Sequence, residues 1–264
     1  MKLFYRQVGE TGMPLIILHG VFGSSDNWLT ISKTIAEGGF RLFLLDQRNH
    51  GRSPHSDEHD YEVLAADLHE FITDHQLEKP ILLGHSMGGK AVMQFAMDYP
   101  GQFSKLVVVD IGPQFYPVHH TDILRGFKAI DLASLTSRND ADRIMSQYEP
   151  DPAVRQFLLK NLYRDENGSF NWRLNLRAIE REIHGIGEEL RHIRTISEPT
   201  LVIRGADSGY IREQDIDLIR RIFLDCTLET VEGAGHWVQA EKPKEFVEVL
   251  FRFLGVPAGA GDSR

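Results

Sequence analysis

The chain has 264 residues, 42% of them hydrophobic, and its 29 basic and 38 acidic residues give a formal net charge of −9. This charge disfavours nucleic acid and anionic membranes as partners, which bind surfaces rich in Lys and Arg, and the single cysteine, Cys226, excludes an internal disulfide and paired-cysteine metal or redox motifs. No apolar run reaches the ~20 residues of a membrane span, and charges interrupt the N-terminus where a signal peptide would have its apolar core, so we expect a cytoplasmic protein whose oligomeric state stays open.

Apolar runs alternate with amphipathic stretches over residues 1–110. The runs that predict buried or half-buried strands are Leu3–Val8, Leu15–Leu18, Arg41–Leu45, Ile81–Leu83 and Leu106–Val109. The stretches that predict helices are Asn27–Ala36, a helix from the N-cap Asp60 to about His75, and Ser86–Asp98. Strands that alternate with helices predict an α/β protein, with a mostly parallel sheet covered by helices on both faces.

The pattern changes between about Pro113 and Thr195, where no strong strand signal is found. Amphipathic stretches there predict a helical insertion, at Thr121–Leu135, Ala141–Gln147, Ala153–Leu162 and Trp172–His184, with a turn at Asp165–Ser169 because Asn-Gly favours a tight hairpin-type bend. Alternation then resumes, with strands at Leu201–Ile203 and Thr227–Val231 and helices at Glu213–Ile222 and Lys244–Phe253. We expect a core formed by residues 1–112 and 196–255, an insertion at 113–195, and a disordered tail at 256–264.

The segment Gly84-His-Ser-Met-Gly88 matches the pattern G-x-S-x-G. It lies between a predicted strand and a predicted helix, the context in which this pattern forms a sharp turn that exposes the serine hydroxyl above the sheet. Glycine is needed at both ends because side chains there would collide, and the helix N-terminus adds positive potential beside the serine. We predict that Ser86 is a nucleophile; an ordinary glycine-rich turn is the structural alternative.

Two further loops follow predicted strands. In the loop His19–Gly23 we expect the N–H of Val21 to form an oxyanion hole with that of Met87, since one such donor is worth about 3–4 kcal/mol in the transition state. The loop Gly233–Trp237 carries His236, which we predict as general base and then general acid. The structural alternative for the loop His19–Gly23 is a plain strand-to-loop turn, and the alternative for His236 is a surface histidine without a catalytic role.

Two aspartates are candidates for the acid that orients this histidine. Asp110 ends the strand after the nucleophile helix, and Asp207 follows the next strand along the chain. Both lie at carboxyl ends of strands, where an open parallel sheet gathers its site. Either carboxylate would orient the imidazole and stabilise its charged form, so the residues alone leave the two open.

The order Ser, Asp, His along the chain, the GHSMG turn, the His19-Gly20 loop and the segment Asp46–Pro54 resemble the α/β-hydrolase family. The stretches GHSMGGKAVM, VVDIGP and GAGHWVQAEKP are similar to its small bacterial carboxylesterase branch. The likeness covers about residues 2–254, with the insertion matching only loosely. It implies the α/β-hydrolase fold, with residues 113–195 as a helical cap over the serine.

The resemblance also implies roles for individual residues. In most members the acid stands three residues after a glycine that follows the penultimate strand, a position held here by Ser208. In the esterase branch it stands at the position of Asp110, so we favour Asp110 and keep Asp207 in reserve. Asp46 and Arg48 resemble a buried ion pair behind the oxyanion loop, to which we give a structural role.

Apolar side chains of the insertion offer surface to a substrate, although we expect most of them to pack the cap onto the core. They are Phe115, Tyr116, Phe127, Tyr148, Phe157, Leu158 and Trp172. Phe22 and Trp237 flank the catalytic loops and are expected to complete the acyl pocket. A capped, mostly apolar pocket suits a small or medium acyl group.

We therefore expect a serine carboxylesterase or thioesterase that acts on small-molecule esters through an acyl-enzyme and needs no cofactor. We expect no metal at His119-His120, which lack a fitting carboxylate or cysteine partner, and we expect His19 to support the oxyanion loop. Perhydrolase and carbon–carbon bond hydrolase chemistry keep the serine and stay open, whereas dehalogenation and epoxide opening need an aspartate in place of Ser86. The non-enzymatic alternative is a ligand sensor that keeps the triad and turns over slowly.

Overall fold

The computed structural model describes residues 1–117, 120–190 and 194–257, so most of the tail predicted to be disordered lies outside the described residues. Within these ranges, seven strands form a central sheet in the spatial order β1, β3, β2, β4, β5, β8, β9. Their bounds are β1 Tyr5–Val8, β2 Met13–Leu18, β3 Phe40–Leu45, β4 Ile81–His85, β5 Lys105–Val109, β8 Thr200–Gly205 and β9 Cys226–Val231. Only the β1–β3 pair is antiparallel among these neighbours, which confirms the predicted, mostly parallel sheet.

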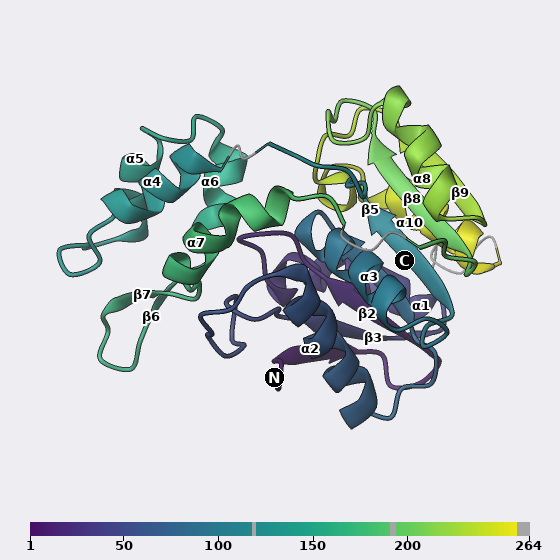
Figure 1. Ribbon diagram of the computed structural model, residues 1–264. Coiled ribbons are helices and arrows are strands. Elements are labelled where there is room, and N and C mark those ends of the chain that lie inside the picture. Colours follow the sequence, from purple (N-terminus) through teal and green to yellow (C-terminus); the bar gives the residue numbers. More distant parts are fainter. Residues whose placement is uncertain (118–119, 191–193, 258–264) are drawn as a thin grey trace.

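Helices cover both faces of the sheet, as predicted (Figure 1). One face packs against α1 (Leu29–Glu37) and α10 (Pro243–Leu254), and the other against α2 (Tyr61–Asp74), α3 (Met87–Asp98) and α8 (Ile216–Ile222). Short 3₁₀ turns, η1 (Ser25–Asn27) and η2 (Glu213–Asp215), precede α1 and α8, and the four-residue helix α9 (Val238–Glu241) follows the loop that carries His236. The turn η2 lies within the predicted helix Glu213–Ile222, whereas α9 and the first two residues of η1 were not predicted, because they are too short to show a helical period.

The local sequence explains where these elements lie. β2 is a continuous apolar run because its residues alternate between two cores: Leu15 and Ile17 pack on the α1 side, and Ile16 and Leu18 on the α2 side. Helix α2 begins after Asp60, as predicted, because the Asp60 carboxylate accepts a 2.8 Å hydrogen bond from a main-chain N–H in the first turn.

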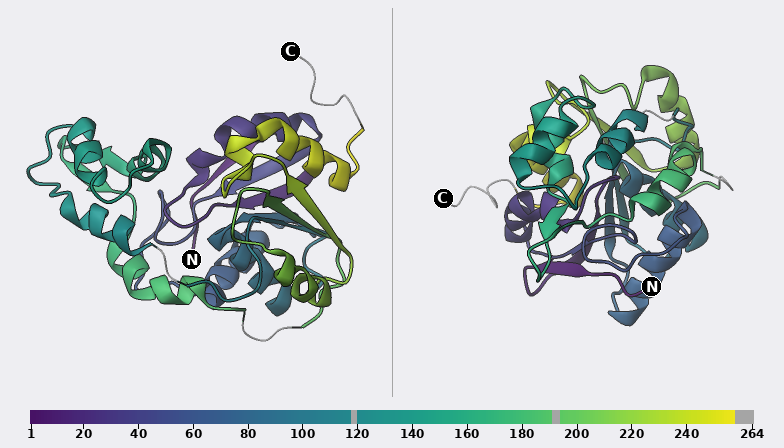
Figure 2. Two further views of the ribbon diagram at one scale, coloured as in Figure 1. Left: turned by 90° about the horizontal axis from the view of Figure 1, so that it is seen from above. Right: turned by 90° about the vertical axis from the view of Figure 1, so that its left-hand side faces the viewer.

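The insertion between β5 and β8 lies beside the core (Figures 1 and 2). It contains α4 (Thr121–Ala129), α5 (Arg138–Met145), α6 (Pro152–Leu159), the hairpin strands β6 (Leu162–Arg164) and β7 (Phe170–Trp172), and α7 (Leu176–Gly187). The prediction of helix at Leu162 and Trp172 is wrong, because those residues pair across the hairpin. The predicted turn between them is confirmed, with Gly168 at a φ of 81° and the Asp165 carboxylate accepting two main-chain N–H groups within it.

Lys90 of α3 joins the core to both ends of the insertion. Its side chain is 0% exposed, and its ammonium donates to the main-chain carbonyl of Gln114 at 2.9 Å and to that of Glu188. The ammonium also lies 5.0 Å from the centre of the Tyr116 ring, and burial lowers the pKa of Lys90 to about 7. The role of Lys90 was not predicted from the sequence, although a lysine in an otherwise apolar helix is a signal of a buried, bonded ammonium group.

Replacing Lys90 by methionine is expected to loosen the insertion and lower the thermal midpoint by roughly 5 °C or more. The change removes the charged donor of two part-buried hydrogen bonds, each worth about 1.5–3 kcal/mol, and 1 kcal/mol shifts the midpoint of a chain this long by about 2–4 °C. Lys105→Met is the matched control, because the Lys105 ammonium donates to a single carbonyl, that of Phe253 at 2.9 Å. Thermal unfolding followed by circular dichroism measures both, and equal shifts would contradict the role given to Lys90.

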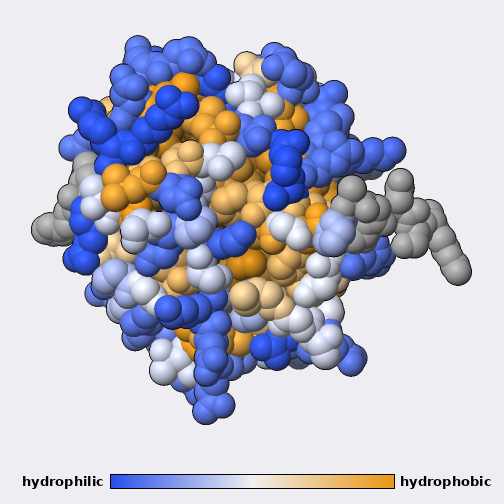
Figure 3. Space-filling view, turned by 90° about the vertical axis from the view of Figure 1, so that its right-hand side faces the viewer, coloured by the Kyte–Doolittle hydropathy of each residue, from blue (hydrophilic) through white to orange (hydrophobic). Residues whose placement is uncertain are grey.

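The surface of the core away from the insertion is seen in Figure 3, where hydrophilic residues form the rim and apolar residues show between them. Across the described residues the exposed large hydrophobic side chains are Met13, Phe115 and Leu224. No helix within these ranges has the length and apolar character that crossing a membrane requires.

Candidate active site

Ser86 stands at the sharp turn between β4 and α3, with a φ of 54° and a ψ of −121°. This strained backbone needs close approach of the chain on both sides. A Cβ atom at Gly84 would lie 2.1 Å from the carbonyl oxygen of Gly88, and one at Gly88 would lie 2.5 Å from that of Leu18. The predicted need for glycine at both positions is therefore confirmed.

The imidazole of His236 meets the carboxylate of Asp110. The distance from His236 Nδ1 to Asp110 Oδ2 is 2.8 Å, and Asp110 is 0% exposed at the carboxyl end of β5. The other Asp110 oxygen accepts from the N–H of Gly205 at 3.1 Å, and the Ser208 hydroxyl donates to Oδ2. Asp207 is exposed at the surface. The structure thus brings Asp110 to the imidazole, and the residue at the usual acid position binds that same carboxylate.

Neighbouring side chains hold the loop of His236 in place. The Tyr210 ring stacks on the imidazole with 3.9 Å between ring centres and 14° between planes. His85 Nε2 lies 2.8 Å from the His236 carbonyl oxygen, and the Glu241 carboxylate accepts from the main-chain N–H of Trp237 at 3.1 Å. The place of Tyr210 was not predicted, because nothing in the loop after β8 indicates which of its side chains reaches the loop after β9.

The loop after β2 contributes a main-chain N–H group, that of Val21, beside the serine. The N–H of Phe22 donates to His50 Nε2 at 3.3 Å, whereas the N–H groups of Val21 and Met87 donate to no acceptor in the described part of the chain. Val21 and Met87 both border the space next to Ser86. These two N–H groups are thus available to bind an oxygen that gains negative charge there.

Three buried histidines lie behind this loop. His19 contacts the Gly20 carbonyl through Nδ1 at 2.8 Å and accepts from the N–H of Gln47 through Nε2, as expected of a residue that supports the loop. The ring centres of His19 and His50 lie 5.1 Å apart, and those of His50 and His59 lie 5.4 Å apart. Burial lowers the pKa of His19 to about 4 and the pKa values of His50 and His59 to about 3, so all three are neutral at pH 7.

Acidification is expected to destabilise the fold through these histidines. Their folded pKa values lie below the ordinary value of 6.5, so the unfolded chain binds more protons and the free energy of unfolding falls as the pH drops from about 6.5 towards 4. Thermal unfolding at pH 5 should therefore give a lower midpoint than at pH 7.5. His59→Gln should narrow this difference and the exposed control His184→Gln should not; a midpoint independent of pH in the parent chain would contradict the account.

The predicted ion pair between Asp46 and Arg48 is wrong. Arg48 pairs instead with Asp67 of α2, with 2.6 Å from Nε to Oδ2 and 2.9 Å from the second nitrogen to Oδ1. The Asp46 carboxylate accepts from the main-chain N–H groups of Ser25 and Arg52, at 2.6 and 2.8 Å, and burial raises its pKa. Asp46 therefore shapes loops near the site through main-chain hydrogen bonds.

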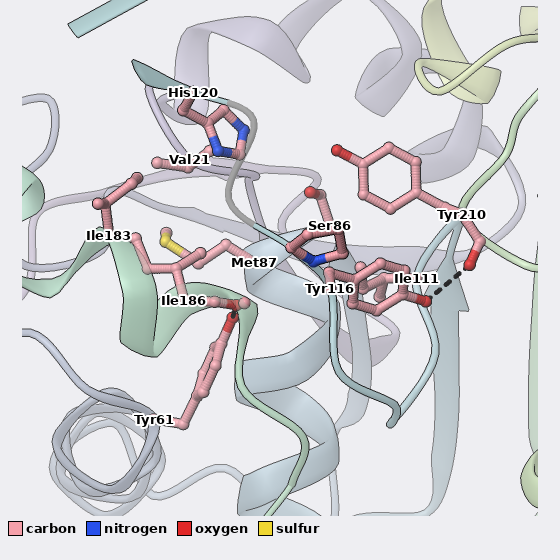
Figure 4. A pocket seen from close by; sticks show the side chains of 12 residues that line it. Val21, Tyr61, Ser86, Met87, Ile111, Tyr116, His120, Ile183, Ile186 and Tyr210 are labelled. Atoms are coloured by element: carbon pink, nitrogen blue, oxygen red, sulfur yellow. Dashed lines mark hydrogen bonds between the residues drawn. The ribbon is translucent and has the colours of Figure 1, made fainter.

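Ser86 borders two hollows between the core and the insertion. The larger is a crevice of about 750 Å³, whose lining includes His236, Phe22, Trp237 and, from α6, Phe157. The smaller is a cavity of about 30 Å³, walled by side chains of α2, α7 and the loops after β5 and β8 (Figure 4). Phe22 and Trp237 thus both border the space into which the serine opens.

The histidine pair at the start of the insertion is described only in part, because His119 lies outside the described residues. The His120 ring lies 5.7 Å from that of Phe22, and His120 borders both hollows. Over the described ranges, no group of three or more His, Cys, Asp or Glu residues is arranged to hold a metal ion.

Comparison with known proteins gives one consistent result. The sequence model of the family described as "alpha/beta hydrolase fold" matches residues 13–243. Esterase YbfF of Escherichia coli is 34% identical over 96% of this chain and 99% of its own length, and the sn-1-specific diacylglycerol lipase ABHD11 of Danio rerio is 35% identical over 91% and 78%. A solved structure of a "Marine microorganism esterase" superposes with a TM-score of 0.93 at 42% identity, covering 96% of this chain and 99% of that one.

Proposed function

The chain belongs to the α/β-hydrolase fold family, of the esterase/lipase type, and from this premise we propose that it is a serine hydrolase of carboxylic esters that works through an acyl-enzyme. The observation that carries the proposal is the set of groups around Ser86. A strained serine, an imidazole paired with a buried carboxylate, and two N–H groups available beside the serine are the parts that acyl transfer needs.

In the first half-reaction the Ser86 hydroxyl oxygen bonds to the ester carbonyl carbon while His236 Nε2 takes the hydroxyl proton. The carbonyl oxygen becomes an oxyanion, which the N–H groups of Val21 and Met87 bind. When the tetrahedral intermediate collapses, the bond from carbon to the alcohol oxygen breaks and His236 returns the proton to that oxygen. The alcohol leaves and the acyl group stays on Ser86.

In the second half-reaction water takes the place of the alcohol. His236 removes a proton from the water as its oxygen bonds to the acyl carbon, and then gives the proton to the Ser86 oxygen as the acyl–enzyme bond breaks. The Asp110 carboxylate accepts the Nδ1–H of His236, which keeps the imidazole in the tautomer whose Nε2 is free to accept. We assign the insertion the role of a cap, since α6 of residues 113–195 walls the crevice opposite the core.

Steady-state hydrolysis of p-nitrophenyl acetate and butyrate tests this proposal. We expect sustained turnover that far exceeds one product per chain. A burst of one equivalent followed by no further release would favour the ligand sensor, and activity that appears only when peroxide or a carbon–carbon substrate is supplied would favour those other serine chemistries.

A further inference from the structure

The two hollows beside Ser86 differ about 25-fold in volume, at about 30 and about 750 Å³. A water molecule needs roughly 10–15 Å³ on the same measure, so the small cavity holds a group of about two or three non-hydrogen atoms. Met87, Ile111 and Ile183 contribute apolar side chains to its lining, which also includes Tyr61 and Tyr116 (Figure 4). It therefore suits a short hydrocarbon tail.

The position of the histidine decides which part of an ester enters which hollow. In the proposed mechanism His236 gives its proton to the alcohol oxygen, so the alcohol must extend on the side of the imidazole. His236 and its neighbour Trp237 border the crevice, whereas the cavity is bordered by the serine and both proposed oxyanion donors but not, among the described residues, by His236. The acyl tail is the part that points away from the histidine.

The charge of the crevice limits the alcohol further. Its described lining contains Glu149, Asp151 and Glu241 but a single Lys or Arg side chain, that of Lys160. Phosphate groups are held by clustered Arg and Lys, and the chain as a whole carries −9. A polyphosphorylated carrier such as coenzyme A would meet repulsion here.

From this arrangement we propose that the small cavity is the acyl subsite and the crevice is the alcohol subsite. The chain then hydrolyses esters of acyl groups with two to about four carbons and bulky alcohols that are uncharged or cationic. This inference rests on the proposed serine esterase function. It also places Phe22 and Trp237, which the sequence led us to expect against the acyl group, on the alcohol side instead.

Paired substrates test each subsite in the intact chain. With p-nitrophenyl esters we expect kcat/KM to fall at least about 100-fold from acetate to octanoate. With acetates of methanol and benzyl alcohol, which are leaving groups of similar basicity, we expect benzyl acetate to react at least about tenfold better. S-acetyl-N-acetylcysteamine should react better than acetyl-coenzyme A, since the two share a thioester and differ in charge.

Substitutions in the cavity and in the crevice test which hollow sets the acyl preference and which sets the alcohol preference. Ile183→Ala enlarges the cavity and should raise the octanoate-to-acetate ratio of kcat/KM at least tenfold, with Ile186→Ala as a second variant on the less buried end of α7. Ile179→Ala is the matched control, because Ile179 is a buried residue of the same helix that does not border the cavity. Phe157→Ala should lower the benzyl-to-methyl ratio and leave the acyl-chain ratio unchanged.

These ratios do not depend on the fraction of active protein, so partial unfolding of a variant does not imitate the result. A parent chain that prefers octanoate, or an acyl-chain ratio that neither α7 variant moves, would overturn the subsite assignment while the esterase proposal stands. Failure to hydrolyse any of the esters would overturn the esterase proposal and the assignment with it.

Discussion

Ser86→Ala is expected to lower kcat/KM for p-nitrophenyl acetate by roughly 10⁴-fold or more, because the variant lacks the hydroxyl oxygen that takes the acyl group in the proposed mechanism. Alanine keeps the Cβ atom, so the strained backbone at a φ of 54° meets the same steric demands in the variant as in the parent. The fold should therefore persist, with an unchanged thermal midpoint within a few degrees.

The matched control is Ser32→Ala, a buried serine of α1 whose hydroxyl donates to the Leu29 carbonyl and which borders neither hollow. It should retain parental activity. Labelling with a fluorophosphonate gives a second measurement, with one label per parent chain and none on the Ser86 variant. Residual hydrolysis above about 1% in a homogeneous Ser86→Ala preparation would remove serine catalysis from the proposal.

Asp110→Asn is expected to lower kcat by roughly 10⁴-fold. The amide can donate to Nδ1 and thereby favour the tautomer whose Nε2 carries the proton and cannot act as base. The 2.8 Å contact between Asp110 Oδ2 and His236 Nδ1 is the geometric ground for this expectation. KM should change much less than kcat, since the carboxylate is fully buried behind the imidazole and borders neither hollow.

Asp207→Asn is the control, with an expected loss of tenfold or less because Asp207 is exposed. The loss in kcat for Ser208→Ala should lie between those for Asp207→Asn and Asp110→Asn. The change removes one donor from the Asp110 carboxylate but leaves its contact with the imidazole. A severe loss on Asp207→Asn with a mild one on Asp110→Asn would reverse the assignment. Moderate losses in both single variants and a severe loss in the double variant would mean that each carboxylate can serve for the other.

The sequence predicted those parts of the molecule that depend on local patterns. A buried strand shows as an unbroken apolar run, a helix start shows as the Asp60 cap, and the turn at Ser86 shows as two glycines at fixed spacing. Such features are fixed by residues close in the chain, because sterics and main-chain hydrogen bonding act over a few residues.

Contacts between distant segments were predicted poorly. From the sequence, Arg48 could form an ion pair with Asp46 or with Asp67. It pairs with Asp67 because α2 packs against the loop after β3. The stacking of Tyr210 on His236 depends on two loops that meet only because β8 and β9 are neighbours in the sheet. The choice of Asp110 over Asp207 rested on a resemblance. Both aspartates follow strands, and the residues around them do not show which one lies closer to the imidazole.

The acceptors that Lys90 uses are main-chain carbonyl groups at the two ends of the insertion, and every residue type supplies such a group. These contacts of Lys90 therefore do not depend on which side chains lie between those ends, so this part of the attachment persists when the intervening sequence changes. For an engineer, Gln114 and Glu188 mark the junctions at which the intervening segment of a relative could be transplanted as one cassette.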